Sequence, residues 1–239
     1  MATDIMGKAL LDYHNGNYYE DIKTFSSFDE ADVIPLPYLF RAFDEMPPIE
    51  QKALALCKGT VFDIGCGAGN HALYLQQNKI DVTVLDNSPG AIATCNARGL
   101  KKTCLSEIQA YTTDSYDTLL LLMNGLGLAG TLANLGTFLK HLKLLLKPGG
   151  QILLDSSDII YMFEKDEDGG YLIPASTIYY GEVIFTMSYK DEQSAPFSWL
   201  YVDFNTLSRI ANAQNFSCEL LYEGEHYDYL ARLKPMPQY

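Results

Sequence analysis

The chain has 239 residues, is 48% hydrophobic and carries a formal net charge of −13. This length suits one globular domain, whereas the negative charge disfavours nucleic acid, which would be repelled. The longest apolar runs, such as Leu119 to Met123, are far short of the roughly 20 residues that a membrane span needs, so we expect no membrane partner.

The cysteines and histidines show no pattern of a disulfide framework or a metal site. The five cysteines are an odd number without a C-x-x-C pair, which suits neither a disulfide framework nor a thiolate zinc site. The four histidines lack metal-ligand spacing. We therefore expect a soluble, cytoplasmic protein without a metal site. The oligomeric state is left open.

The first 50 residues contain 3 Lys and Arg against 10 Asp and Glu, with many Tyr and Phe. We interpret residues 1–50 as an acidic helical cap on a single domain spanning residues 1–239.

From residue 60 onward, apolar runs of strand length alternate with stretches of helical period, which indicates a parallel sheet covered by helices. The pattern predicts strands at 60–64, 81–85, 101–105, 118–123 and 151–155, and helices at 70–77, from Pro89 to about 98, and from 132 to 147. Ser88 is the expected N-cap of the second helix, and Gly99 follows its end.

Residues 157–200 interrupt this alternation with turn material and an alternating stretch, Tyr179 to Tyr189, which predicts an inserted β-hairpin. Residues 156–200 hold 2 Lys and Arg against 8 Asp and Glu. A final helix at 203–214 and strands at 217–222 and 227–233 complete the expected fold.

The segment VFDIGCGAGN, residues 61–70, joins a buried strand to a helix through glycines. Gly65 and Gly67 allow a tight turn and close approach of a ligand. The following helix N-terminus favours an anionic group. The glycine spacing is G-x-G-x-G, and Asn70 stands where a dinucleotide fingerprint has its third glycine. Asp63 lies two residues before Gly65, which also departs from the nicotinamide pattern.

This segment resembles motif I of the class I S-adenosylmethionine-dependent methyltransferases. The resemblance implies that Asp63 lies near the ammonium end of the cofactor and that the glycine turn passes under its methionine and ribose. It also implies that Asp86, 23 residues later, accepts the ribose hydroxyls. The segments YDTLLLLMNGLGLAG and LKPGGQILLD are also typical of the family.

The resemblance implies a Rossmann-like α/β fold: seven mostly parallel strands, helices on both faces and an antiparallel last strand. Leu105 and Ser106 occupy the expected adenine position. Cys66 is interpreted as a small filler, and His71 either reaches the cofactor carboxylate or only begins the helix. The candidate cofactor-binding residues are Asp63, Gly65, Cys66, Gly67, Gly69, His71, Asp86, Asn87, Leu105, Ser106 and Asn124.

Methyl transfer from a sulfonium is an in-line displacement that needs alignment and, for a protonated acceptor, a base. The sequence identifies no catalytic residue. Acceptors should enter over the carboxyl ends of the fourth and fifth strands, near Asn124, Asp155, Ser156, Ser157 and Asp158. The acidic, aromatic caps favour a neutral or cationic small-molecule acceptor. A cofactor-binding protein without catalysis and a nicotinamide oxidoreductase are the alternatives.

Overall fold

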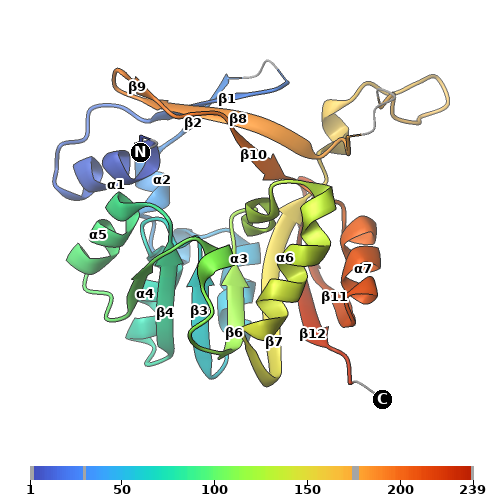
Figure 1. The fold of residues 1–239 in the computed structure, drawn as a ribbon. Coiled ribbons are helices and arrows are strands. Elements are labelled where there is room, and N and C mark those ends of the chain that lie inside the picture. The colour runs from blue at the N-terminus through green and yellow to red at the C-terminus, as the bar shows by residue number, and fades with distance from the viewer. Residues whose placement is uncertain (1–2, 29–30, 174–177, 238–239) are drawn as a thin grey trace.

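The computed structural model describes residues 3–28, 31–173 and 178–237 and contains two sheets. The larger sheet has seven strands in the order β11-β12-β7-β6-β3-β4-β5 (Figure 1). Their bounds are β3 Thr60–Ile64, β4 Asp81–Asp86, β5 Thr103–Leu105, β6 Tyr116–Leu121, β7 Leu146–Ser157, β11 Phe216–Glu223 and β12 Asp228–Pro235.

Strands β3 to β7 pair in parallel, whereas β12 is antiparallel to both β7 and β11. Because the five parallel strands share one direction, their carboxyl ends meet at one edge of the sheet. The expected seven-stranded, mostly parallel sheet with an antiparallel last strand is confirmed.

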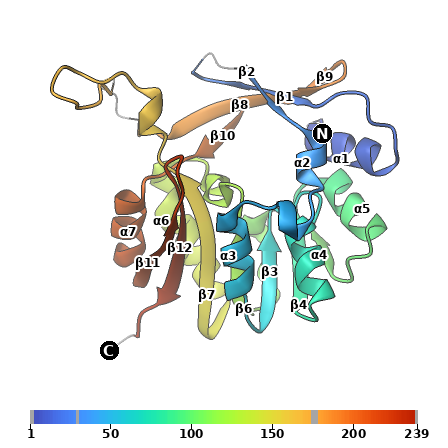
Figure 2. The same ribbon diagram turned by 180° about the vertical axis from the view of Figure 1, so that it is seen from behind.

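Helices cover both faces of this sheet (Figures 1 and 2). On one face, α6 (Leu132–Leu144) and α7 (Phe204–Ala213) pack against a core that includes Phe62 and Leu119. On the other face, α3 (Pro48–Leu56), α4 (Asn70–Gln77) and α5 (Pro89–Ala97) cover Val61 and Leu120. Neighbouring residues of β3 and β6 thus face opposite cores, so these strands are apolar on both sides.

A second, smaller sheet lies across the carboxyl ends of the parallel strands (Figure 1). Its strands run in the order β10-β8-β1-β2, with β9 paired to β8. The bounds are β1 Ile22–Ser26, β2 Ala31–Ile34, β8 Glu182–Tyr189, β9 Glu192–Gln193 and β10 Phe197–Leu200. We call this sheet the roof.

The N-terminal cap differs in part from the helical segment that we expected. It contains α1 (Ile5–His14), α2 (Leu36–Leu39), the 3-10 turn Phe43–Glu45 and α3, but also strands β1 and β2. The second segment forms the expected hairpin, β8 with β9, and β8 pairs antiparallel with β1. The two acidic segments therefore build one roof together.

The element bounds match the sequence pattern closely in the core, and one difference has a clear cause. The PGG segment suggested that the fifth strand begins at Gln151, but β7 begins at Leu146 and shifts register between Leu146 and Gln151. Gly149 has a φ of 76° there, so glycine lets the strand bulge rather than end.

Three further 3-10 turns are Ile108–Ala110, Gly125–Ala129 and Ile159–Met162. Within the described part of the chain, no helix is long and apolar enough to cross a membrane.

Candidate functional site

The loop between β3 and α4 lies at the carboxyl edge, and its glycines have different roles. Gly65, Gly67 and Gly69 all have positive φ, at 75°, 54° and 79°. A Cβ at Gly67 would meet nothing within 4 Å, whereas one at Gly69 would lie 2.6 Å from Leu100 Cδ1 and 2.9 Å from Cys95 Sγ. The turn at Gly67 is therefore open to a ligand, and Gly69 is required by packing.

Asp63 is the penultimate residue of β3, close to this loop, and is only 2% exposed. Its Oδ2 atom has no hydrogen-bond partner within the described structure. Burial raises the pKa of Asp63 to about 6, and the nearby His71 partly offsets this effect. A buried carboxylate oxygen without a donor is costly, so this atom indicates a site for a positively charged donor.

Asp86 ends β4, the neighbouring strand. Its carboxylate accepts hydrogen bonds from the backbone N–H groups of Gly67 and Ser88, both at 2.9 Å. Burial raises the pKa of Asp86, and these backbone donors oppose the shift. Each oxygen keeps a lone pair for another donor, so Asp86 ties the glycine loop to β4 and can still bind hydroxyl groups.

The predicted adenine side lies next to Asp86. Leu105 pairs with Asp86 in the sheet and is 54% exposed, and the Ser106 N–H donates to the Asp86 carbonyl at 3.1 Å. The amide of Asn87 donates to Glu107 at 3.0 Å. An exposed leucine at a strand end provides an apolar surface on which a flat ring can pack.

Cys66 packs against α5 rather than facing a reactive environment. Its Sγ lies 3.7 Å from that of Cys95. The contact with Cys95, followed by burial, raises the pKa of the Cys66 thiol. Because the thiolate is the nucleophilic form, this environment agrees with the small-filler interpretation.

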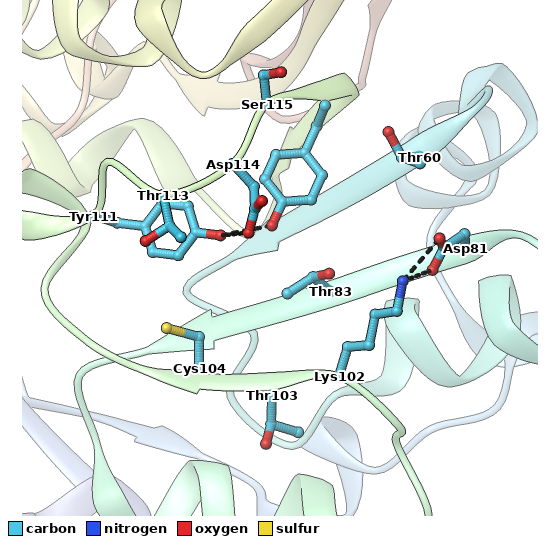
Figure 3. A pocket seen from close by; sticks show the side chains of 11 residues that line it. Thr60, Asp81, Thr83, Lys102, Thr103, Cys104, Tyr111, Thr113, Asp114 and Ser115 are labelled. Carbon is cyan, nitrogen blue, oxygen red and sulfur yellow. Dashed lines mark hydrogen bonds and ion pairs between the residues drawn. The ribbon is translucent and has the colours of Figure 1, made fainter.

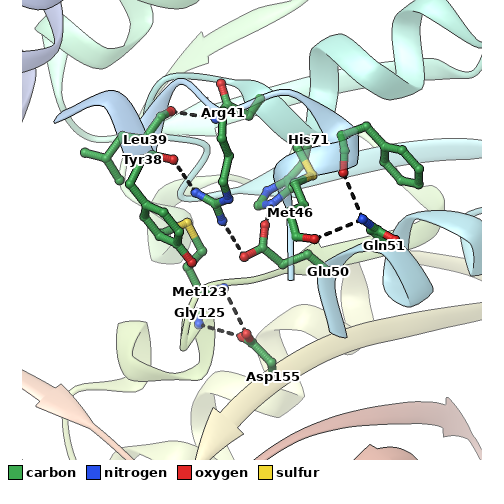
Figure 4. A network of polar contacts seen from close by, with 12 residues as sticks. Tyr38, Leu39, Arg41, Met46, Glu50, Gln51, His71, Met123, Gly125 and Asp155 are labelled. Atoms are coloured by element: carbon green, nitrogen blue, oxygen red, sulfur yellow. Dashed lines mark hydrogen bonds and ion pairs between the residues drawn. The ribbon is translucent and has the colours of Figure 1, made fainter. Parts of the chain in front are cut away.

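A buried polar network joins the N-terminal cap to the first turn of α4 (Figure 4). His71 Nε2 lies 2.8 Å from Glu50 Oε2, and Glu50 also forms a buried ion pair with Arg41. The Arg41 guanidinium lies over the Tyr38 ring, 3.8 Å from its centroid. His71 is therefore more than a helix-start residue, because it connects the first turn of α4, next to the glycine loop, to the N-terminal cap.

The protonation of this network is set by competing effects. Burial alone would raise the pKa of Glu50, but His71 and Arg41 outweigh it and lower the pKa below its usual value. The Arg41 Nε atom remains buried without a partner among the described residues. Sequence reasoning missed Arg41 and Glu50, because the acidic composition of the cap does not indicate which carboxylate lies inward.

A cavity of about 310 Å³ lies beside this network at the carboxyl edge. The expected acceptor-side residues Asn124, Asp155 and Ser157 line it, whereas Ser156 and Asp158 do not. The hydroxyl of Ser156 instead accepts from the Val202 N–H at 3.0 Å. The complete lining is Tyr38, Pro47, Ile49, Glu50, Met123, Asn124, Asp155, Ser157 and Asp228.

Asp155 holds the turn that follows β6. Its carboxylate accepts from the N–H groups of Met123 at 3.0 Å and Gly125 at 3.3 Å. Met123 and Asn124 both have positive φ, at 62° and 57°, a costly conformation for non-glycine residues that recurs at functional sites. Burial raises the pKa of Asp155 to about 7, and Glu50 adds to this shift.

The aromatic residues of the caps play different parts. Tyr38 lines the cavity, but the hydroxyls of Tyr179 and Tyr180 donate to Asp203 and Asp158, both at 2.7 Å. Trp199 packs closely against Gly127. Contacts within the protein, hydrogen bonds for Tyr179 and Tyr180 and packing for Trp199, thus account for three of these aromatics.

A larger cavity of about 550 Å³ lies at the opposite edge of the sheet (Figure 3). It is lined by residues at the amino ends of strands, such as Thr60, Asp81 and Tyr116. Lys102 pairs with Asp81 there at 2.7 Å. Because ligands of open α/β sheets bind at the carboxyl ends of the strands, the smaller cavity is the candidate site.

Comparison with known proteins adds a family context. Residues 61–150 match a family described as a methyltransferase domain. The chain is 42% identical to a solved S-adenosylmethionine-dependent methyltransferase from Bacteroides fragilis in complex with S-adenosylhomocysteine. The TM-score is 0.91, and the match covers 98% of this chain and 95% of that chain.

More distant structures share the fold alone. A sugar N-methyltransferase from Streptoalloteichus is 14% identical with a TM-score of 0.56, covering 79% of this chain and 85% of that one. An amino pentose methyltransferase from Micromonospora echinaspora is 15% identical with a TM-score of 0.55, covering 81% and 91%. A comparison with curated protein sequences finds no match.

Proposed function

Because this chain belongs to the S-adenosylmethionine-dependent methyltransferases, we propose that it transfers the methyl group of that cofactor to a small-molecule acceptor bound in the cavity beside Asp155. The observation that carries this proposal is the open glycine turn beside the unpartnered carboxylate oxygen of Asp63. Nucleic acids and membranes are not proposed as partners.

The residues at the carboxyl edge fit the cofactor in charge and shape. The unpartnered Asp63 oxygen suits the ammonium of the methionine end, and the unpartnered Arg41 Nε–H suits its carboxylate. Asp86 suits the ribose hydroxyls. The proposed cofactor residues are Asp63, Gly65, Cys66, Gly67, Gly69, His71, Asp86, Asn87, Leu105, Ser106 and Asn124, and we include Arg41 because of its unpartnered Nε atom.

Bound S-adenosylmethionine supplies a methyl group on positively charged sulfur, so the protein needs no covalent intermediate. Its residues instead bind, orient and exclude water. The roof covers the carboxyl edge of the large sheet (Figure 1), and the cavity at this edge is large enough for a small molecule. Hydrogen bonds from Met123 and Gly125 fix Asp155 at the cavity wall.

Thermal unfolding with S-adenosylhomocysteine, with NAD and without ligand tests the cofactor assignment. We expect only S-adenosylhomocysteine to raise the midpoint. Conversion of S-adenosylmethionine to S-adenosylhomocysteine in the presence of a metabolite pool then tests transfer. Stabilisation by NAD alone would contradict the proposal, and cofactor binding without turnover across the pool would favour a non-catalytic role.

A further inference from the structure

We propose that the methyl acceptor is a small amine, bound as its ammonium form between Asp155 and Asp228, and that Asp155 takes its proton before transfer. This inference rests on the proposed function and names the substrate class of the same site. It follows from the charges of the cavity lining, from the geometry of Asp155 and from the apolar residues of the same lining.

The cavity has a negative charge that no protein cation balances. Its lining contains three carboxylates, Glu50, Asp155 and Asp228, and no lysine or arginine among the described residues. Glu50 is already paired with Arg41 and His71. Neither of the other two carboxylates enters an ion pair within the described structure. A ligand cation would supply the missing charge.

Asp155 is held in an orientation that suits this role. It is 7% exposed, and each oxygen accepts one backbone N–H, which leaves a second lone pair on each oxygen for a ligand donor. These hydrogen bonds anchor the carboxylate to the turn at Met123 and Gly125. The acceptor nitrogen would therefore meet a preorganised group rather than a mobile side chain.

The groups around Asp155 suit proton transfer near neutral pH. It faces Glu50 on α3, His71 on α4, Tyr38 on α2 and Asp228 on β12. Burial and, to a smaller extent, Glu50 raise the pKa of Asp155, whereas the Gly125 N–H and His71 lower it, and the result is about 7. A general base is most effective when its pKa lies near the working pH.

The proton and electron balance of the step is simple. The ammonium gives one proton to a carboxylate oxygen of Asp155, and the nitrogen keeps the electron pair. That pair forms the new N–C bond to the methyl carbon, while the C–S bond breaks and its electron pair stays on sulfur. Asp155 then releases the proton to solvent, and the methylated amine leaves with a positive charge.

The rest of the lining indicates that the amine carries an apolar body. Pro47, Ile49 and Met123 supply hydrophobic surface, and Tyr38 adds an aromatic ring. Such a wall binds a hydrocarbon portion, while the carboxylates fix the polar end. A ring bearing an aminomethyl group has both parts, so benzylamine is a suitable probe.

The test compares the binding of benzylamine, benzyl alcohol and benzoate, which differ in charge but hardly in size. Each is titrated by calorimetry into the protein loaded with S-adenosylhomocysteine at pH 7.5. We expect benzylamine to bind at least about tenfold more tightly than benzyl alcohol, the range of a buried charge-assisted pair, and benzoate to bind least. Equal binding, or no binding by benzylamine, would overturn the inference.

Variants identify the carboxylate responsible. Asp155→Asn should remove most of the preference for benzylamine, whereas Asp81→Asn, which removes an equal charge at the opposite edge of the sheet, should keep it. If the Asp155 variant does not fold, Asp228→Asn is measured instead, and it should also reduce the preference for benzylamine. A preference unchanged in both cavity variants would contradict the assignment.

The pH dependence adds a readout that a merely structural role would not produce. Benzylamine affinity should fall roughly eightfold from pH 7.5 to pH 6, because only about a tenth of a carboxyl with a pKa near 7 is ionised at pH 6, and Asp155→Asn should flatten this profile. Affinity for S-adenosylhomocysteine is measured in parallel. If the wild-type protein does not bind S-adenosylhomocysteine, the proposed function is contradicted. If it binds S-adenosylhomocysteine but does not prefer benzylamine, only this inference is overturned.

Discussion

The carboxylates at the two ends of β4 provide a controlled comparison of single residues. Asp86 contacts the glycine loop, whereas Asp81 is exposed and pairs with Lys102. We expect Asp86→Ala to weaken S-adenosylmethionine binding by about 1–3 kcal/mol, because hydroxyl donors and two backbone N–H groups lose a charged acceptor. Calorimetry measures the change. Asp81→Ala should leave the affinity unaltered, and equal effects of both would remove Asp86 from the ribose role.

Two glycines with similar backbone conformation form another matched pair. Gly67 and Gly149 have φ values of 54° and 76°, and a Cβ at either would meet nothing within 4 Å. Valine should strain both positions, but only Gly67→Val should abolish binding of S-adenosylhomocysteine, because its side chain would occupy ligand space. If titration gave the same affinity for both variants, the loop would be structural only.

The sequence predicts residues whose role depends on local spacing. Asp63 and Gly67 lie in one strand–turn–helix segment, and Asp86 follows at the end of the next strand, so the motif alone brings them together. Arg41 and Glu50 could not be found in this way. Their role depends on the packing of the cap against α4, and only the structure brings them to His71.

At the scale of elements, Asp4 connects two helices through one side chain. It caps α1 by accepting from the Gly7 N–H, and it accepts from Ser88 Oγ and the Gly90 N–H at the start of α5, each at 2.9 Å. Asp4→Ala should lower the free energy of unfolding by about 1–3 kcal/mol. Urea denaturation measures this loss.

The control for that measurement is Asp44→Ala, since Asp44 is an exposed carboxylate elsewhere in the cap. It should change the free energy of unfolding by less than about 0.5 kcal/mol. A similar loss in both variants would indicate a general effect of charge removal, and the link between α1 and α5 would then contribute little.

Elements of the large sheet are predictable because strands buried on both faces form uninterrupted apolar runs bounded by glycine or polar turns. The roof strands lack this signal. In β1 only Ile22 is buried, and β2 has no buried residue. β1 pairs with β2 on one side and with β8 on the other, and β8 lies more than 150 positions away in the chain. Local sequence reasoning cannot detect that distant partner.

For the whole molecule, two buried carboxyls should make stability depend on pH. Burial raises the pKa of Asp63 to about 6 and that of Asp155 to about 7, above the value of about 3.9 in an unfolded chain. The folded state therefore binds more protons between pH 4 and 7. Their contribution to stability is fully present below pH 4 and is lost as the pH rises to 7.

We expect the free energy of unfolding, measured by urea denaturation without ligand, to decline from pH 5 to pH 7. Asp63→Asn and Asp155→Asn should each reduce this decline, because the amide does not titrate. The pH slope of each variant is compared with that of the wild type. General repulsion within a chain of net charge −13 contributes to both slopes and so cancels from their difference. A slope that neither variant alters would show that other groups dominate.

The pairing of β1 with β8 also fixes an order of events during synthesis. At roughly 5–20 residues per second, the ribosome needs roughly 8–30 s to extend the chain from the end of β1 to the start of β8. Throughout that interval β1 lacks its neighbour β8, so one edge of the β1–β2 hairpin stays unpaired. The glycine loop and the strands around it emerge earlier. The nascent protein therefore contains its glycine loop before it can complete the roof, and the unpaired edge of β1 is open to association with other strands during that period.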